Sequence, residues 1–298
     1  MAKYSIKTME GIGMEGKRLD PKRAKRFKRH QRLTILKSTG IAVIENECFK
    51  NFTNLREIKI CEGVTVIGEG AFKSCTALRR IVLPDTLVSI GEGAFDGCTS
   101  LEEITLPPGI VDLSDRLFRN CKRLRRVVMM GPVFRVGKDA FFNCEGIQEI
   151  NLPDSIEIIG TRAFYRCRGL TGELQLPRNL KAIEEECFLG LSISGIRWND
   201  CLNVVGFKAF FRCRYLETVS IPENVQAIDE WAFHGCNRLK EIRFRHVPEM
   251  GEWLTNRSTT WYCPRGSSIV SYCQAFGYPC HFLEIEMDGQ DEAIWDCV

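Results

Sequence analysis

The chain has 298 residues, of which 44% are hydrophobic and 27% charged, and its formal net charge is +3. No apolar run approaches the ~18 residues that a membrane-spanning helix needs, so the composition argues against a membrane span. The charge is unevenly distributed: residues 1–38 hold 12 Lys/Arg and 3 Asp/Glu (+9), which leaves 29 and 35 (−6) for residues 39–298. The basic charge therefore belongs to an N-terminal arm.

Residues 1–32 form this basic arm, which we expect to be disordered because its first part is polar and lacks hydrophobic periodicity. Asp20 and Pro21 are residue types favoured at the N-cap and first position of a helix, so a short helix is expected there. The cations that follow surround Phe27 and are Lys22, Arg23, Lys25, Arg26, Lys28 and Arg29. Such a cluster is typical of a nuclear-import signal or a phosphate-binding arm, and also of a solvated basic tail.

Residues 33–244 repeat one pattern, I-G-x-x-A-F-x-x-C-x-x-L-x-x-I-x-L-P, with a period of 23 residues in most copies. A fixed period of this length predicts a solenoid of stacked coils in a single domain. The repeat phenylalanines are Phe49, Phe72, Phe95, Phe118, Phe141, Phe164, Phe188, Phe210 and Phe233, which gives about nine repeats plus caps.

Each unit predicts two short extended segments and a turn. Alternating apolar residues closed by proline, as at Ile81, Leu83 and Pro84, are typical of a short strand. The segment before the phenylalanine, such as residues 64–68, is a second extended piece. Because parallel strands lie about 4.8 Å apart, equivalent residues of successive coils should touch and form continuous internal ladders. The fold class is an α/β repeat solenoid.

Fifteen cysteines are present, and most occupy repeat positions. Cys48 and Cys187 replace the alanine before the phenylalanine, and seven others lie three residues after it: Cys75, Cys98, Cys121, Cys144, Cys167, Cys213 and Cys236. We expect these thiols to be free and buried as small hydrophobic side chains. With no C-x-x-C pair and scattered histidines, the sequence predicts neither a metal site nor a cofactor.

The repeat becomes irregular between residues 171 and 200, where we expect a local bend. The distance from the phenylalanine to the first aliphatic residue of the strand is usually 9 residues, but it is 10 from Phe164 to Leu174 and 8 from Phe188 to Ile196. Irregular coils in solenoids often carry function.

After the last repeat, residues 245–283 are expected to form a C-terminal cap. Residues 261–277 predict a strand, a turn and a serine-capped helix that ends at Gly277. A cap of this kind shields the apolar face and strand edge of the last coil. Residues 284–298 form an acidic tail that could screen the basic arm.

The repeat pattern resembles the BspA-like (Treponema-type) leucine-rich repeats over residues 33–244, and residues 261–282 are similar to the closing cap of that family. The resemblance implies a leucine-rich-repeat right-handed coil with short parallel strands on the concave face. It also implies binding of protein or glycan rather than catalysis. Surface members of the family carry export signals and anchors, which we do not find in this sequence.

One column of the repeat suggests a binding surface. The position after the repeat phenylalanine is charged in most coils, as at Lys50, Lys73 and Arg119, and so should face water. In four successive coils it is apolar, and these residues with two adjacent arginines form a candidate binding strip: Phe142, Tyr165, Leu189, Phe211, Arg166 and Arg212. Exposed aromatic residues rimmed by arginine are typical of binding hot spots. A flap, the bend or self-association would instead cover them.

A second candidate surface is a basic belt formed by Arg119, Lys122, Arg123 and Arg126. It could meet acidic partners or phosphate. Alternatively its charge is matched between neighbouring coils, because Glu103, Arg126 and Glu149 alternate in sign along one strand column.

No catalytic motif is found in the sequence, so we expect a non-enzymatic, cytoplasmic protein-interaction scaffold whose partner the sequence does not name. Residues 1–20 lack the apolar segment of a secretory signal. One alternative is a cell-surface or secreted adhesin with oxidised cysteines. Another is a nuclear or nucleic-acid-associated adaptor that acts through the basic arm.

Overall fold

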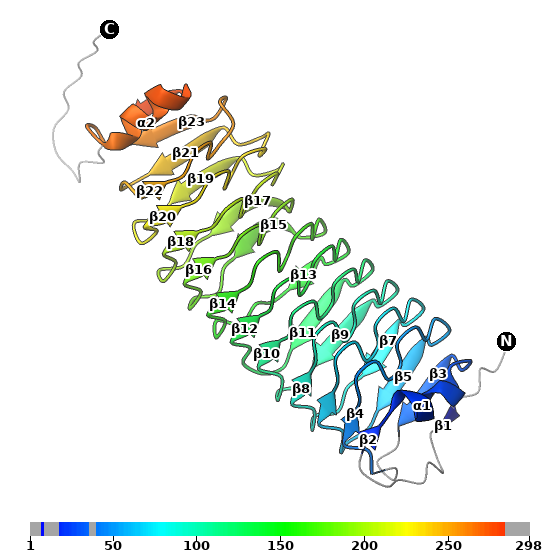
Figure 1. Cartoon of the computed structure of the whole chain (residues 1–298). Coiled ribbons are helices and arrows are strands. Elements are labelled where there is room, and N and C mark those ends of the chain that lie inside the picture. Colours follow the sequence, from blue (N-terminus) through cyan, green and yellow to red (C-terminus); the bar gives the residue numbers. More distant parts are fainter. Residues whose placement is uncertain (1–6, 9–17, 36–39, 284–298) are drawn as a thin grey trace.

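The computed structural model describes residues 7–8, 18–35 and 40–283, which form one elongated array of stacked coils (Figure 1). The N-terminal residues lie at one end of the array and the C-terminal helix at the other. The prediction of a repeat solenoid is confirmed.

Each coil contributes one strand to each of two rows of parallel strands. The first row lies at the start of each coil and comprises β1 (Lys7–Thr8), β3 (Arg32–Ile35), β5 (Glu57–Ile60), β7 (Arg80–Val82), β9 (Glu103–Leu106), β11 (Arg126–Met129), β13 (Glu149–Ile150), β15 (Thr171–Gln175), β17 (Ser192–Arg197), β19 (Thr218–Ile221), β21 (Glu241–Phe244), β23 (Thr260–Cys263) and β24 (Cys280–Phe282). Hydrogen bonding divides this row into the sheets β1-β3-β5-β7, β9-β11-β13, β15-β17 and β19-β21-β23-β24.

The second row precedes the repeat phenylalanines, as expected for the second extended piece. It comprises β2 (Arg18–Leu19), β4 (Val43–Ile44), β6 (Val66–Ile67), β8 (Ser89–Ile90), β10 (Asp112–Leu113), β12 (Arg135–Val136), β14 (Ile158–Ile159), β16 (Ala182–Ile183), β18 (Val204–Val205), β20 (Ala227–Ile228) and β22 (Glu249–Met250). These strands form two sheets, β2-β4-β6-β8 and β10 to β22. Equivalent positions pair, so Val127 of β11 lies opposite Ile104 of β9 and Ile150 of β13.

The core is the phenylalanine ladder that the repeat predicted. All nine rings are fully buried, and consecutive rings stack on one another from Phe49 to Phe233. The centroids of Phe72 and Phe95, for example, are 5.4 Å apart with planes inclined by 7°. Every coil thus buries a phenylalanine at the same position, which explains why the spacing of the phenylalanines along the sequence is nearly constant.

The cysteines of the repeat fill buried positions next to this ladder, and they also satisfy backbone carbonyls. The Cys98 thiol donates to the Phe72 carbonyl oxygen of the neighbouring coil at 3.1 Å. Equivalent bonds are donated by Cys75, Cys121, Cys144, Cys167, Cys213 and Cys236. Burial raises the pKa of the Cys75 thiol to about 12. These cysteines are therefore protonated packing residues with a hydrogen-bonding role.

The described part of the basic arm, residues 18–32, is folded rather than disordered. It contains β2, the helix α1 (Pro21–Ala24) and the 3₁₀ turn η1 (Lys25–Phe27). Asp20 caps α1 as expected, because its carboxylate accepts the Arg23 backbone N–H at 2.8 Å. Leu19, Ala24 and Phe27 are buried against the first coil. The apolar residues spaced through the basic sequence thus bind it to the end of the core.

The irregular repeat produces the longest strands of the first row, β15 and β17. Their pairing shifts register between Gly172 and Glu173. Ile193 and Gly195 of β17 pair with the consecutive residues Gly172 and Glu173, so Ser194 is an extra residue that β17 accommodates as a bulge.

The C-terminal elements match those expected for a cap. Strand β23 is followed by the helix α2 (Ser268–Phe276), which ends at Gly277 with a left-handed φ of 74°. Ser267 stands at the N-cap, but its side chain donates and accepts no capping hydrogen bond. Trp261 is fully buried and stacks on Phe244 of the last repeat at 5.0 Å. The predicted acidic tail, residues 284–298, lies outside the described residues.

Candidate functional site

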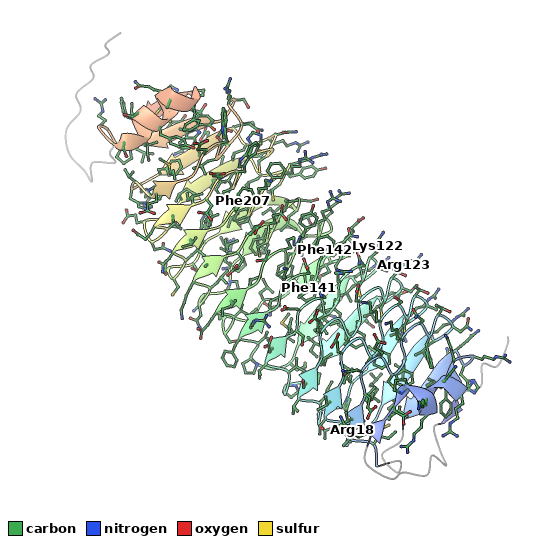
Figure 2. All side chains as sticks on the ribbon, viewed as in Figure 1. Arg18, Lys122, Arg123, Phe141, Phe142 and Phe207 are labelled. Atoms are coloured by element: carbon green, nitrogen blue, oxygen red, sulfur yellow. The ribbon has the colours of Figure 1, made fainter. Side chains whose placement is uncertain are left out.

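The turns that run from each repeat phenylalanine to the leucine about six residues later form one edge of the solenoid, which we call the turn edge. Lys122, Arg123 and Phe142 lie along it (Figure 2). The binding strip and three residues of the basic belt, Arg119, Lys122 and Arg123, therefore lie on the same edge in different coils, whereas Arg126 lies in strand β11.

The binding strip is continuous but less exposed than expected. The rings of Phe142 and Tyr165 stack with centroids 4.6 Å apart and planes inclined by 9°. Phe211 stacks on His234 at 6.0 Å and lies 6.3 Å from Trp231. These residues are half-buried by one another. Leu189 is only 7% exposed, so the prediction that it faces water is wrong: neighbouring turns cover it.

Leu189 forms part of the floor of a hollow of about 550 Å³ on the turn edge, which we call the turn-edge hollow. Its floor is the turn at residues 189–192, and its two walls are residues 165–168 and 208–215. In the coil of Phe164 the first paired strand residue, Thr171, comes seven residues after the phenylalanine, whereas its partner Ser192 comes four residues after Phe188. Because the turn after Phe188 is three residues shorter, we infer that it lies below its neighbours and leaves the hollow between them.

The hollow is strongly cationic. Its lining includes one carboxylate, Glu186, and five cations: Arg166, Arg168, Lys208, Arg212 and Arg214. Within the described residues none of these five is in an ion pair. A cluster of unmatched positive charges favours an anionic ligand and accelerates its association.

Three of these cations lie over aromatic rings. The guanidinium of Arg166 lies 5.2 Å from the Tyr165 ring centroid, and that of Arg212 lies 5.1 Å from the Phe211 centroid. Lys208 Nζ lies 4.6 Å from the ring of Phe207 (Figure 2) and 5.7 Å from that of Phe211. Cation–π contacts hold the charged groups at the surface without neutralising them. The hollow therefore presents both apolar rings and available charge.

Arg166 and Arg212 occupy unfavourable backbone positions. The second residue after each repeat phenylalanine is in the left-handed region, and Arg166 and Arg212 have φ of 57° and 60° there. The other coils use residues that tolerate this conformation, namely Asn51, Ser74, Gly97, Asn120, Asn143, Gly190 and Gly235. For an ordinary side chain it costs about 1–2 kcal/mol. The position two residues before the phenylalanine is left-handed as well, and Arg116, Arg162 and Lys208 adopt that conformation there, so the backbone conformation alone does not distinguish the hollow.

The glycines of the following coils make room for these arginine side chains. A Cβ atom at Gly190 would lie 3.6 Å from Arg166 Cγ, and one at Gly235 would lie 2.8 Å from Arg212 Cγ. Both arginine side chains therefore run along the turn edge toward the next coil.

Two of the four cations of the basic belt are in ion pairs. Arg119 Nε lies 3.3 Å from Asp96 Oδ1, and Arg126 Nε lies 3.9 Å from Glu149 Oε2. Within the described part of the chain, Lys122 and Arg123 are exposed and in no ion pair. The belt thus retains two free cations and no hollow, because its turns have the standard length.

The cations of the basic arm surround the first coil. Arg23 Nε pairs with Asp20 Oδ2 at 3.3 Å, and the Arg26 guanidinium lies 5.4 Å from the Phe27 ring centroid. Lys22, Lys25, Lys28 and Arg29 are exposed. The described arm is a basic face of the folded N-terminal coil.

The described residues bear on metal binding, thiol reactivity and membrane spanning. Among them no group of three or more His, Cys, Asp or Glu side chains is arranged to hold a metal ion. Burial raises the pKa of the Cys98, Cys121 and Cys167 thiols well above its ordinary value, which suppresses nucleophilic thiolates. None of the helices in the described ranges has the length and apolar character needed to cross a membrane.

Sequence reasoning placed Tyr165, Leu189, Phe211, Arg166 and Arg212 in one site, and the structure brings them together. Phe142 stacks on this group but does not line the hollow. The sequence reading missed the other lining cations and one ring: Arg168, Lys208, Arg214 and Tyr215. The short distance from Phe188 to Ile196 was visible in the repeat, and it is the one sequence signal near these residues.

Comparisons with known proteins agree with the repeat architecture. A family model described as "BspA type Leucine rich repeat region (6 copies)" matches residues 24–148 and 135–259. No curated protein matches the chain.

Among solved structures, a leucine-rich repeat protein from Bacteroides ovatus is 21% identical, with a TM-score of 0.59; the match covers 86% of this chain and 85% of that chain. A leucine rich cell surface protein from Faecalibacterium prausnitzii is 19% identical, with coverage of 95% and 89% and a TM-score of 0.49. The first similarity supports the fold alone, and the second supports no conclusion about this chain because its TM-score is below 0.5.

Proposed function

The chain belongs to the BspA-type leucine-rich repeat family, and from this premise we propose that it is a non-enzymatic scaffold that binds a partner protein through the turn-edge hollow. Repeat solenoids present extended surfaces on which loops of individual coils can specialise. The shortened turn and its two neighbours are such a specialisation.

The partner segment that fits the hollow is acidic and carries an aromatic or large apolar side chain. Carboxylates would form charge-assisted hydrogen bonds with Arg166, Arg168, Arg212 or Arg214. An aromatic side chain would pack on the half-buried rings of Tyr165 and Phe211. The volume of about 550 Å³ is within the range of ~300–1,000 Å³ typical of ligand sites.

One observation carries the proposal: five cations face a single hollow, and none of them has an ion-pair partner among the described residues. Elsewhere on the solenoid, cations are commonly paired across coils, as Arg135 is with Asp112 and Asp115. A partner would pair with these charges and cover the apolar rings between them.

The experiment is a fluorescence-anisotropy titration of a labelled synthetic peptide, rich in Asp and Glu with one central Trp, which we call the acidic probe. Arg166→Glu with Arg212→Glu should weaken binding about a hundredfold, because two central contacts become repulsive. Lys122→Glu with Arg123→Glu is the matched control. It makes the same charge change on the same edge and should alter the dissociation constant by less than about threefold.

Two results would contradict the proposal. Equal losses of affinity in both double variants would mean that the probe responds to net charge alone. A loss only in the Lys122 and Arg123 variant would move the site to the basic belt. Unfolding of each variant by urea, followed by circular dichroism, establishes that the compared proteins are folded.

The buried thiols support a reducing, cytoplasmic location as a further part of this proposal. Oxidation of Cys98 or Cys144 would remove the hydrogen bond that each thiol donates to the neighbouring coil. A mass-spectrometric count of free thiols in the native source should find the repeat cysteines reduced. Paired cysteines in the cap, at Cys263, Cys273 or Cys280, would favour the alternative of a surface adhesin.

A further inference from the structure

We propose that residues 284–298 of this chain bind the turn-edge hollow of the same molecule and compete there with the partner. The inference rests on the proposed function, since it requires that the hollow accept an acidic peptide. It adds a means of regulation, because any event that draws these residues away would expose the site.

The sequence of residues 284–298 has the chemistry that the hollow favours. It contains no Lys or Arg and six carboxylates: Glu284, Glu286, Asp288, Asp291, Glu292 and Asp296. Ile294 and Trp295 stand between acidic residues, so apolar and charged groups alternate over a short distance. Such a peptide can place an indole on the rings while its carboxylates face the guanidinium groups.

Charge complementarity is strong at this site. The lining of the hollow has five cations and the single carboxylate Glu186, a net charge of +4, against −6 for residues 284–298. Because Arg166 and Arg212 lie over rings rather than beside carboxylates, binding the tail breaks no ion pair among the described residues. At the basic belt, by contrast, Asp96 and Glu149 already compete for Arg119 and Arg126.

The chain is long enough to make this contact. Leu283 follows β24, which is three strands from β19 in their sheet. Leu283 is separated from the near wall of the hollow by three strand spacings of about 4.8 Å each and, at right angles to these, by a strand length of about 15 Å. The direct distance is therefore about 20 Å. The seven residues 284–290 span about 23 Å when extended. Residues 291–296 can therefore reach the hollow.

Cations on the intervening coil continue the positive surface toward the C-terminal cap. The Arg238 guanidinium lies 4.9 Å from the ring centroid of Tyr215, which lines the hollow. Arg238 and Lys240 line a second, smaller hollow of about 430 Å³ that also includes Glu217. The acidic residues nearest to Leu283 would pass over this coil, where the positive charges of Arg238 and Lys240 attract them.

Attachment to the same chain makes a weak contact effective. A short tether gives an effective concentration on the order of millimolar, so a tail with a dissociation constant of about 0.1 mM would weaken partner binding about tenfold. The strength of this competition would not depend on the protein concentration, because the tail and the hollow belong to one molecule.

The test uses the full chain and the acidic probe. In the tail variant, Asp291→Asn, Glu292→Gln and Asp296→Asn remove three charges around Trp295. This variant should bind the probe about tenfold more tightly than the unmodified chain. The matched control, Glu284→Gln with Glu286→Gln and Asp288→Asn, removes the same charge from the connecting residues and should gain less than about threefold. Adding Arg166→Glu and Arg212→Glu to the tail variant should abolish the gain.

The outcomes separate the inference from the proposed function. If the probe binds the unmodified chain through the hollow and neither tail variant changes its affinity, the inference fails and the proposed function stands. Equal gains in the two tail variants also overturn it, because they indicate general repulsion. A gain that falls as the protein is diluted would show contact between copies and contradict the intramolecular contact. If the probe binds no form, including the tail variant, the proposed function itself fails.

Discussion

Two stretches of the turn edge carry similar numbers of cations but differ in what surrounds them. In the coils of the basic belt, Arg116 pairs with Glu92 and lies 4.0 Å from Asp139, and Arg119 pairs with Asp96. Around the turn-edge hollow, Arg166 and Arg212 lie over aromatic rings, and no described carboxylate pairs with them. Lys122 and Arg123 of the belt are unpaired among the described residues as well, so the two stretches differ mainly in the hollow and the aromatic rings that surround the free cations.

The largest expected effect is on stability, and it should be much larger in the core ladder than at the neighbouring aromatic rings of the binding strip. Phe141 is fully buried between Phe118 and Phe164, so Phe141→Ala should lower the free energy of unfolding by about 3–5 kcal/mol. Phe142 is half-buried, and Phe142→Ser should cost only about 1 kcal/mol. Urea unfolding monitored by circular dichroism measures both. Similar losses at the two positions would show that the strip belongs to the core.

Alkaline pH tests the cysteine ladder that both stretches share. Burial raises the pKa of the Cys75 thiol from 9.0 to about 12, so above pH 9 the unfolded chain releases protons that the folded protein retains. The free energy of unfolding should therefore keep the full contribution of this thiol below pH 9 and should fall as the pH rises toward 12. Cys144→Ala, which removes another buried thiol, should make the decline shallower. Stability that is constant over this range would contradict the account of the ladder.

The carboxylates of the two stretches should respond differently to removal. Asp96 is 7% exposed at its side chain and lies 3.6 Å from Lys73 and 3.3 Å from Arg119, so Asp96→Ala should lower stability by about 1–2 kcal/mol. Glu186→Gln in the hollow should leave stability unchanged and strengthen binding of the acidic probe about threefold. A destabilised Glu186→Gln protein would indicate that this carboxylate is a structural partner.

The smallest expected change in stability has the opposite sign. Arg166→Asn or Arg212→Asn places a tolerant residue at a left-handed position and should raise the free energy of unfolding by up to about 1 kcal/mol. The same substitutions should weaken probe binding, because each removes a cation. Thermal unfolding and anisotropy titration on the same samples measure both effects. A variant that binds less and is also less stable would argue that the arginine packs rather than binds.

The fold could be predicted from the sequence because each coil packs the same residue types at the same positions. Phe72, Cys75 and Leu78 recur at a constant spacing, and stacking makes each one touch its own equivalents. The arm was harder to predict, because its buried residues Leu19, Ala24 and Phe27 are separated by cations and have no repeat to place them. Charge suggested a tail, whereas three apolar side chains were enough to attach it to the first coil.

The site could be predicted only in part for a similar reason. A column of the repeat identified Phe142, Tyr165 and Phe211, since stacking carries one position onto the next. The burial of Leu189 could not be predicted from its column, because most other coils leave this position half-buried and the turn after Phe188 departs from the repeat length. Lys208 and Tyr215 belong to other columns of the repeat, so no single column places them in the site.

Hydrogen–deuterium exchange with and without the acidic probe tests the central claim most directly, because it locates the bound peptide without any substitution. The account predicts protection confined to the backbone amides of residues 165–168, 189–192 and 208–215. Protection at residues 116–126 instead, or spread over the first-row strands, would contradict it.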